Sequence, residues 1–272
     1  MAQSGRSPSL GVPGIRARKG GGQPLVMVTA YDAPTARAAA AAGVDLILVG
    51  DSLGMVVLGF EDTLVVSLED MARHTAAVAR TAPPQLVVAD MPWTSYHTGP
   101  DDAVRNAAVL VRAGAGAVKL EGGAKRLGVL KAILDAEVPV MGHLGLTPQS
   151  VRAMGGFRVQ GKQPEEAKLL LEDAIALAEA GCFAMVLEGV PEGLAREITA
   201  AVPVPTIGIG AGAGCDGQVL VFHDIVGMSG PRTPRFARQY AHLEDLATRA
   251  LSEWAADVRE RRFPAAAETY RG

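Results

Sequence analysis

The sequence predicts an α/β fold, a (β/α)8 TIM barrel that carries extra helices at its C-terminal end. Two observations lead to this prediction. From residue 24 onward, about eight short runs rich in β-branched residues alternate with amphipathic, alanine-rich stretches. The short runs are apolar almost throughout, which is typical of parallel strands that helices cover on both sides. Parallel neighbours need a crossover connection, and the alanine-rich stretches supply it.

The elements follow one another in this alternating order along the chain. Each strand is a short apolar run, and each helix has apolar residues at helical spacing on one side. We expect helices over residues 67–80, 101–112, 125–135, 164–180 and 192–201. We expect strands over residues 25–29, 45–49, 85–89, 117–120, 138–143, 183–187, 205–209 and 219–222.

Three segments of the chain nearly repeat one another, over residues 42–51, 113–122 and 180–189. In each, an Ala-Gly pair ends a helix, a strand follows, and a carboxylate stands at the end of that strand. Glycine suits the left-handed position that closes a helix. The recurrence of one unit favours a barrel.

A doubly wound open sheet is the alternative fold. Residues 212–217 match the pattern GxGxxG after a predicted strand. That fingerprint requires a helix next, whereas residues 218–222 have the pattern of another strand. We therefore expect these glycines to allow a close backbone approach at the barrel rim.

The first 23 residues differ from the rest of the chain. They combine Gly, Ser and Pro with four basic residues and no acidic residue. We expect residues 1–23 to form a flexible N-terminal arm, and residues 24–272 to form a single barrel catalytic domain. An arm that contacts RNA or an acidic partner is the alternative.

Charge and cysteine content exclude several classes of protein. The 272 residues include 26 Lys and Arg against 29 Asp and Glu, a net charge of −3. This mild acidity argues against a nucleic-acid-binding protein, and no apolar run is long enough for a membrane span. The two cysteines form no CxxC motif, which suits a reducing cytoplasm.

Four carboxylates fall where predicted strands end, at the face on which barrel enzymes place their active sites. Each has a simpler explanation, as a turn residue, a helix cap or one half of an ion pair. Their occurrence at four corresponding places favours a common site. They are Asp51, Asp90, Glu121 and Glu188.

Lys119 and Glu121 stand two residues apart on one strand, so both side chains point to the same side. A structural ion pair is one interpretation; a cation that holds an anionic substrate beside a metal ligand is the other. Asp51 and Asp90 then leave two uncompensated negative charges. A divalent cation would cancel them, and oxygen ligands favour Mg²⁺ over Zn²⁺.

Two further residues are candidates for the chemistry. Glu188 lies on another strand as an unpaired carboxylate, which suits a general base. His143 ends a further strand between glycines, and we favour ligand contact over a core histidine. Trp93 and Tyr96 follow Asp90, where packing is the more common role for aromatic side chains.

These residues lie in short motifs, in order and with compatible gaps from about residue 24 to about residue 265, that closely resemble the ketopantoate hydroxymethyltransferase family. A glycine-bounded loop at residues 156–161 is also similar. Two departures are the longer arm and Trp93, which stands where Phe is expected. The motifs are TAYD at 29–32, VGDSLG at 49–54, ADMP at 89–92, VKLEG at 118–122, GHLGLTPQ at 142–149, Leu-Glu at 187–188 and IGIGAG at 207–212.

The resemblance implies a barrel of the phosphoenolpyruvate/pyruvate type. It also implies transfer of a one-carbon unit from methylenetetrahydrofolate to 3-methyl-2-oxobutanoate, which gives 2-dehydropantoate for pantothenate and coenzyme A. It also implies a homo-oligomer, in this family often a decamer. The implied roles are metal binding for Asp51 and Asp90 with Glu121 at or near the Mg²⁺, oxo-acid binding for Ser52 and Lys119, substrate or product contact for His143, and proton acceptance for Glu188.

Two other functions remain open from the sequence. Another enolate-forming barrel, a lyase or mutase acting on a 2-oxo acid with Mg²⁺, would share the metal site but need no folate. A non-catalytic ligand sensor would have no use for an unpaired base.

Overall fold

The computed structural model describes residues 10–270 apart from residues 82 and 231–232. The chain divides into two compact units, Met1–Phe222 and His223–Gly272. The sequence prediction placed residues 24–272 in one domain, so the observed division differs from the predicted bounds. Residues 1–9 of the predicted arm lie outside the described part of the chain.

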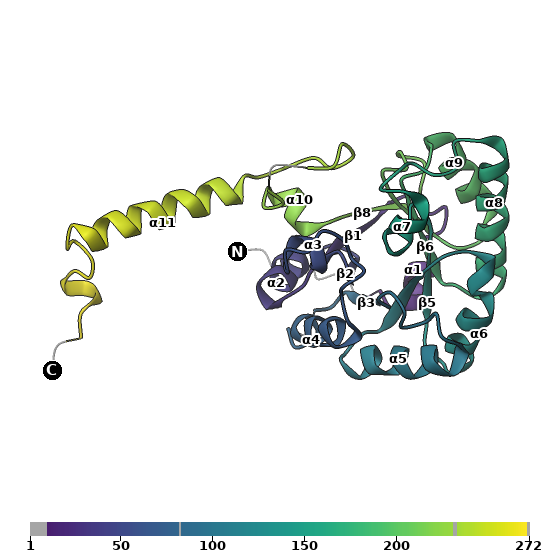
Figure 1. The fold of residues 1–272 in the computed structure, drawn as a ribbon, viewed down its shortest axis with the longest axis horizontal. Helices are drawn as coiled ribbons and strands as arrows, with labels where there is room; N and C mark the ends of the chain where they lie inside the picture. Colours follow the sequence, from purple (N-terminus) through teal and green to yellow (C-terminus); the bar gives the residue numbers. More distant parts are fainter. Residues whose placement is uncertain (1–9, 82, 231–232, 271–272) are drawn as a thin grey trace. The chain divides into compact units, whose positions relative to one another are not determined.

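The first unit is built on a closed barrel of eight parallel strands in sequence order, which confirms the predicted fold (Figure 1). The barrel closes where β1 pairs with β8. The last predicted strand is displaced, because β8 begins at Gly217 and not at residue 219. The strands are β1 (Leu25–Thr29), β2 (Leu46–Val49), β3 (Leu86–Asp90), β4 (Ala117–Glu121), β5 (Val140–Gly145), β6 (Ala184–Glu188), β7 (Thr206–Ile209) and β8 (Gly217–Leu220).

The position of β8 explains why residues 212–217 match the pattern GxGxxG, because the last glycine of the pattern, Gly217, is the first residue of β8. Gly217 pairs with Leu25 across the closure of the barrel. A Cβ atom on Gly217 would stand only 2.6 Å from the carbonyl oxygen of Leu25. The glycine is therefore required by a close backbone approach, as predicted, and the open-sheet alternative is wrong.

Helices connect the strands and lie outside the barrel wall (Figure 1). The predicted helices are present, and several begin at sequence-encoded caps: Ser67 accepts a hydrogen bond from the backbone N–H of Asp70. Gly43 ends α2 in the left-handed conformation, with φ of 74°. The helices are α2 (Ala33–Ala42), α3 (Leu53–Val56), α4 (Leu68–Ala79), α5 (Pro100–Arg112), α6 (Leu127–Asp135), α7 (Val151–Met154), α8 (Pro164–Glu179) and α9 (Glu192–Ala201), with the 3₁₀ turns η1 (Ala124–Arg126) and η2 (Pro148–Ser150).

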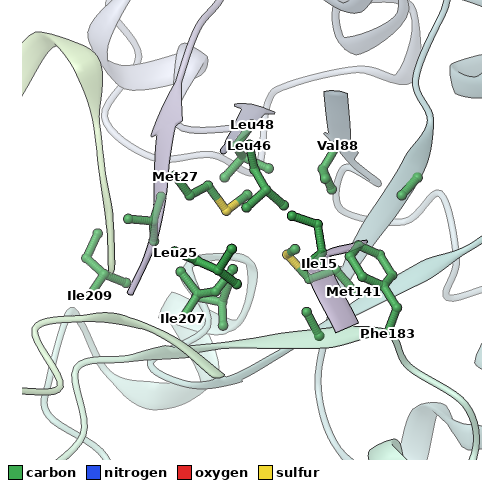
Figure 2. Close-up of a cluster of buried hydrophobic side chains, with 14 residues drawn as sticks. Ile15, Leu25, Met27, Leu46, Leu48, Val88, Met141, Phe183, Ile207 and Ile209 are labelled. Carbon is green, nitrogen blue, oxygen red and sulfur yellow. The ribbon is translucent and has the colours of Figure 1, made fainter. Parts of the chain in front are cut away.

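The core of the barrel includes a residue from the segment that the sequence predicted to be a flexible arm. Helix α1 (Val12–Arg16) contributes Ile15, which is fully buried in a cluster that includes Met141 on β5 and Phe183 just before β6 (Figure 2). Lys19 continues this attachment with an ion pair to Asp216, its Nζ 2.9 Å from Oδ2. The prediction of a flexible arm is therefore wrong for the segment around α1, because Ile15 is buried in the barrel and Lys19 is held by Asp216, although most of residues 16–23 are exposed.

The second unit holds the extra C-terminal helices. It contains most of α10 (Phe222–Val226), then α11 (Leu243–Arg259) and the 3₁₀ turn η3 (Ala266–Glu268). None of the residues of α11 is buried. In the described part of the chain, no helix is long and apolar enough to cross a membrane.

Candidate active site

The predicted site residues come together at the carboxyl ends of β2 to β6. Strand register brings them level, because Asp90 on β3 is paired with Lys119 on β4. Glu121 on β4 is likewise paired with His143 on β5. Asp51 lies two residues after the end of β2, and Glu188 ends β6. Parallel pairing therefore aligns side chains that are far apart in the sequence.

Asp51, Asp90 and Lys119 form one half of the site. Oδ2 of Asp90 accepts a hydrogen bond from the backbone N–H of Asp51 at 3.0 Å. Oδ1 of Asp90 lies 2.8 Å from Nζ of Lys119. The predicted structural alternative paired Lys119 with Glu121, but the observed ion pair joins Lys119 to Asp90. All three side chains are buried.

Glu121, His143 and Glu188 form the other half. Nδ1 of His143 lies 3.2 Å from Nζ of Lys119 and 3.3 Å from Oε1 of Glu121. Lys119 and Glu121 therefore point to the same side of β4, as predicted. Nε2 of His143 lies 3.2 Å from Oε2 of Glu188. Glu188 is thus not the unpaired carboxylate that the sequence suggested, since the imidazole is its partner.

Glu188 differs from the other acids in its exposure. Its side chain is 16% exposed, whereas that of Glu121 is 3% and that of Asp90 is 4% exposed. Among these carboxylates, Glu188 is the one best placed to meet a molecule that enters the site.

Gln149 links the two halves of the site, and the sequence reasoning assigned it no role. Its Nε2 donates to Oδ2 of Asp51 at 2.9 Å, and its backbone N–H donates to Oε2 of Glu121 at 3.0 Å. The hydroxyl of Tyr96 donates to Oε1 of Gln149 at 2.6 Å. Gln149 ends the GHLGLTPQ motif at residues 142–149, which was the only sequence signal for it.

Ser52 lies at the edge of the same site. Its hydroxyl is 2.9 Å from the hydroxyl of Tyr31, which follows β1. Tyr96 is buried, as expected for a packing residue, but Trp93 is 42% exposed. Packing therefore accounts for Tyr96 and not for Trp93.

The charges of the site shift the pKa values of its members. Burial, followed by the charges of Asp90 and Glu121, raises the pKa of Asp51 well above its usual value. Burial by itself would lower the pKa of Lys119, but the charges of the same acids and of Asp51 outweigh it and raise that pKa.

The pKa of His143 is also shifted by its surroundings. Burial and the charge of Lys119 would lower its pKa, but hydrogen bonds to Glu121 and Glu188 and the charge of Glu121 raise it to about 9. Nδ1 of the imidazole thus faces both Glu121 and Lys119, whereas Nε2 faces Glu188.

The carboxylate oxygens of the site suit a hard divalent cation, although each carboxylate already contacts another side chain of the protein. Among the described residues, no group of three or more His, Cys, Asp or Glu side chains is arranged to hold a metal ion. Burial, and after it the charges of Asp90 and Glu121, disfavour a negative charge on Asp51 and raise its pKa. Added positive charge would relieve that repulsion, and oxygen donors are those that Mg²⁺ prefers.

Comparison with known proteins identifies similar chains and folds. Residues 10–266 match the family model described as ketopantoate hydroxymethyltransferase. A protein of Bradyrhizobium diazoefficiens named 3-methyl-2-oxobutanoate hydroxymethyltransferase 2 is 53% identical over 100% of this chain and 93% of its own length.

Solved structures share the fold at low sequence identity. A phosphoenolpyruvate phosphomutase from Streptomyces platensis subsp. rosaceus superposes with a TM-score of 0.61 at 16% identity, covering 92% of this chain and 88% of that one. A phosphonopyruvate hydrolase in complex with oxalate and Mg²⁺ has a TM-score of 0.59 at 16% identity, covering 96% of this chain and 91% of that one. These likenesses show the fold alone, a closed barrel of parallel strands surrounded by helices.

Proposed function

Because the chain belongs to the ketopantoate hydroxymethyltransferase family, a family of transferases, we propose that it transfers a hydroxymethyl group from methylenetetrahydrofolate to 3-methyl-2-oxobutanoate. The product is 2-dehydropantoate, a precursor of pantothenate, and the reaction depends on Mg²⁺. One observation carries the proposal: the partly exposed carboxylate of Glu188 contacts His143, and His143 in turn contacts the buried Glu121 and the ammonium of Lys119.

The metal is assigned to the buried acids. Asp51 and Asp90 hold Mg²⁺, with Glu121 at or near it; their burial and mutual repulsion support this assignment. The phosphonopyruvate hydrolase of the same fold was solved with Mg²⁺. When bound, the ion polarises the oxo group of the substrate and offsets the negative charge that develops on its oxygen.

The remaining residues bind the oxo acid and move its proton. Lys119 balances the substrate carboxylate, and Ser52 and His143 contact the substrate. Glu188 accepts the proton that leaves C3, and its ion pair with His143 holds the carboxylate in place. The electron pair left on C3 then attacks the methylene carbon of the folate donor, while one of the two C–N bonds of that carbon breaks and its nitrogen takes up the proton abstracted from C3. Water then replaces the second nitrogen on the same carbon, which supplies the hydroxyl, gives its remaining proton to that nitrogen and releases tetrahydrofolate.

Other features of the chain support a proposed assembly and location. Helix α11 exposes an apolar row formed by Leu246, Leu251, Trp254 and Val258. We assign this row to contact with further copies of the chain, so that the enzyme is a homo-oligomer, and light scattering by the intact protein checks the assembly. Cys182 and Cys215 are both free and buried, which supports a cytoplasmic location.

Exchange of the C3 proton of 3-methyl-2-oxobutanoate for deuterium tests the proposed function. Nuclear magnetic resonance follows the exchange with and without Mg²⁺ and with and without tetrahydrofolate. We expect exchange that requires Mg²⁺, and product only when the folate donor is present. A lyase or mutase would exchange the proton but make no product from folate, and a sensor would not exchange it.

Two variants separate the base from the metal ligands. Glu188→Gln keeps the shape of the side chain, so we expect it to bind Mg²⁺ and oxo acid but to exchange about 100-fold more slowly or worse. Undiminished exchange would reject Glu188 as the base. Asp90→Ala should weaken Mg²⁺ binding in a calorimetric titration, and an unchanged affinity would remove Asp90 from the ligands.

A further inference from the structure

Three nitrogen-bearing side chains, Lys125, Arg126 and His97, form a cluster beside the site on the loops that follow β3 and β4. Lys125 and Arg126 lie in η1, and their stems cover the backbone of Gly122. A Cβ atom on Gly122 would stand 3.1 Å from Cγ of Arg126 and 3.3 Å from Cε of Lys125. Gly122 directly follows Glu121, so this cluster adjoins the carboxylates.

One aromatic ring connects the cluster to the site. Cζ of Arg126 lies 5.4 Å from the centre of the Tyr96 ring, and the ring of His97 is centred 4.3 Å from it. The hydroxyl of Tyr96 donates to Gln149 and accepts from the backbone N–H of Glu121 at 3.2 Å. Stacking on the buried ring holds the guanidinium of Arg126 in place, and the guanidinium needs no carboxylate partner for this.

The two cations have no acidic partner in the described part of the chain. The ion pairs found there include neither Lys125 nor Arg126. Asp173, an acid beside this loop, instead accepts a hydrogen bond from the backbone N–H of Ala124 at 2.7 Å. Burial, then Arg126 and Lys125, lowers the pKa of His97 to about 4, so this imidazole is neutral.

The cluster also contains unsatisfied polar atoms. Nε of Arg126 and Nδ1 of His97 are buried, and neither makes a hydrogen bond with a described residue. Buried polar atoms in native proteins nearly always have a partner, so two exceptions in one cluster need an explanation. The two positive charges and the two nitrogen atoms without hydrogen-bond partners together indicate an anion-binding site.

We propose that the cluster of Lys125, Arg126 and His97 binds the glutamyl carboxylates of the one-carbon donor. This inference rests on the proposed function, because it takes the folate as second substrate. Lys119, inside the site, already matches the carboxylate of the oxo acid. The folate brings two further carboxylates at the end remote from its reacting carbon. Arg126 offers a fork of donors for a carboxylate and Lys125 a point charge.

Kinetics with two donors test the inference. The double variant Lys125→Ala/Arg126→Ala is compared with the natural protein, using methylenetetrahydrofolate and the corresponding methylenetetrahydropteroate, which lacks the glutamyl group. We expect the KM for the first donor to rise about 10- to 100-fold, and the KM for the second to stay nearly unchanged. Proton exchange on the oxo acid needs no folate and should keep its rate, which also shows that the variant folds.

Two further variants sharpen the comparison. Lys131→Ala is the control: it removes an exposed cation from α6, the helix that follows η1. It should leave both KM values unchanged. Arg126→Lys keeps the charge and should behave closer to the natural protein than Arg126→Ala. An equal loss on both donors, or an unchanged KM for methylenetetrahydrofolate, would overturn the inference. A natural protein that uses neither donor would overturn the proposed function, and the inference with it.

Discussion

Replacing Gln149 by leucine tests whether this residue holds the carboxylates ready for the metal. The substitution keeps the approximate volume and the backbone N–H that donates to Glu121, but it removes the side-chain donor to Asp51. A hydrogen bond to a charged group contributes about 1.5–3 kcal/mol. If the bond aligns Asp51 for the cation, its loss lowers Mg²⁺ affinity by about 10- to 100-fold, as is typical for partners of metal ligands.

Isothermal titration with Mg²⁺ measures the effect. The substitution also leaves the carbonyl of Met91 and the hydroxyl of Tyr96 without the partner that Gln149 provides, so circular dichroism first establishes that the variant folds. Tyr96→Phe removes one hydroxyl only and should weaken binding by less than Gln149→Leu does. Gln239→Leu, which removes an exposed amide bonded to Thr233, is the matched control. A folded Gln149→Leu protein with the natural Mg²⁺ affinity would refute the reasoning.

Two further predictions concern the segment that closes onto the barrel through α1. Ile15→Ala deletes a fully buried side chain, so urea unfolding should show a loss of about 2–5 kcal/mol; a loss near zero would mean that the segment is a flexible arm after all. Burial by itself would raise the pKa of Asp216, but hydrogen bonds from Thr206 and Lys19 outweigh it and lower that pKa below the usual 3.8. A carboxyl whose pKa is lower in the folded than in the unfolded state stabilises the protein at every pH above its unfolded-state pKa. This stabilisation is lost as the pH falls through the folded-state pKa. Asp216→Asn should therefore reduce thermal stability at neutral pH, and the difference from the natural protein should shrink towards pH 3; a constant difference contradicts this account.

The segment around Ile15 shows where local patterns are insufficient. Helix α1 spans only Val12–Arg16, which is too short for apolar residues to repeat at helical spacing. Its glycine-rich, basic surroundings have the composition of a flexible arm. The segment is ordered because Ile15 finds an apolar surface inside the barrel, and that surface exists only after eight strands have closed.

The ion-pair partners of the charged site residues likewise depend on the tertiary structure. Period-two alternation placed Lys119 and Glu121 on one side of β4. The choice of partner depends on the neighbouring strands, and their register sets Asp90 beside Lys119 and His143 beside Glu121. Gln149 lies four residues beyond the end of β5, where no periodicity indicates which way a side chain points.

By itself, the sequence determined the alternation of strands and helices, and hence the barrel and the face on which Asp51, Asp90, Glu121 and Glu188 lie. These features depend on apolar period, on glycine stops and on the position of acids relative to strand ends, all of which are local. Only the tertiary structure decided that Lys119 pairs with Asp90, that His143 supports Glu188, and that Gln149 joins the two halves. Such contacts join residues far apart in the chain, and the register of the closed barrel sets their distances.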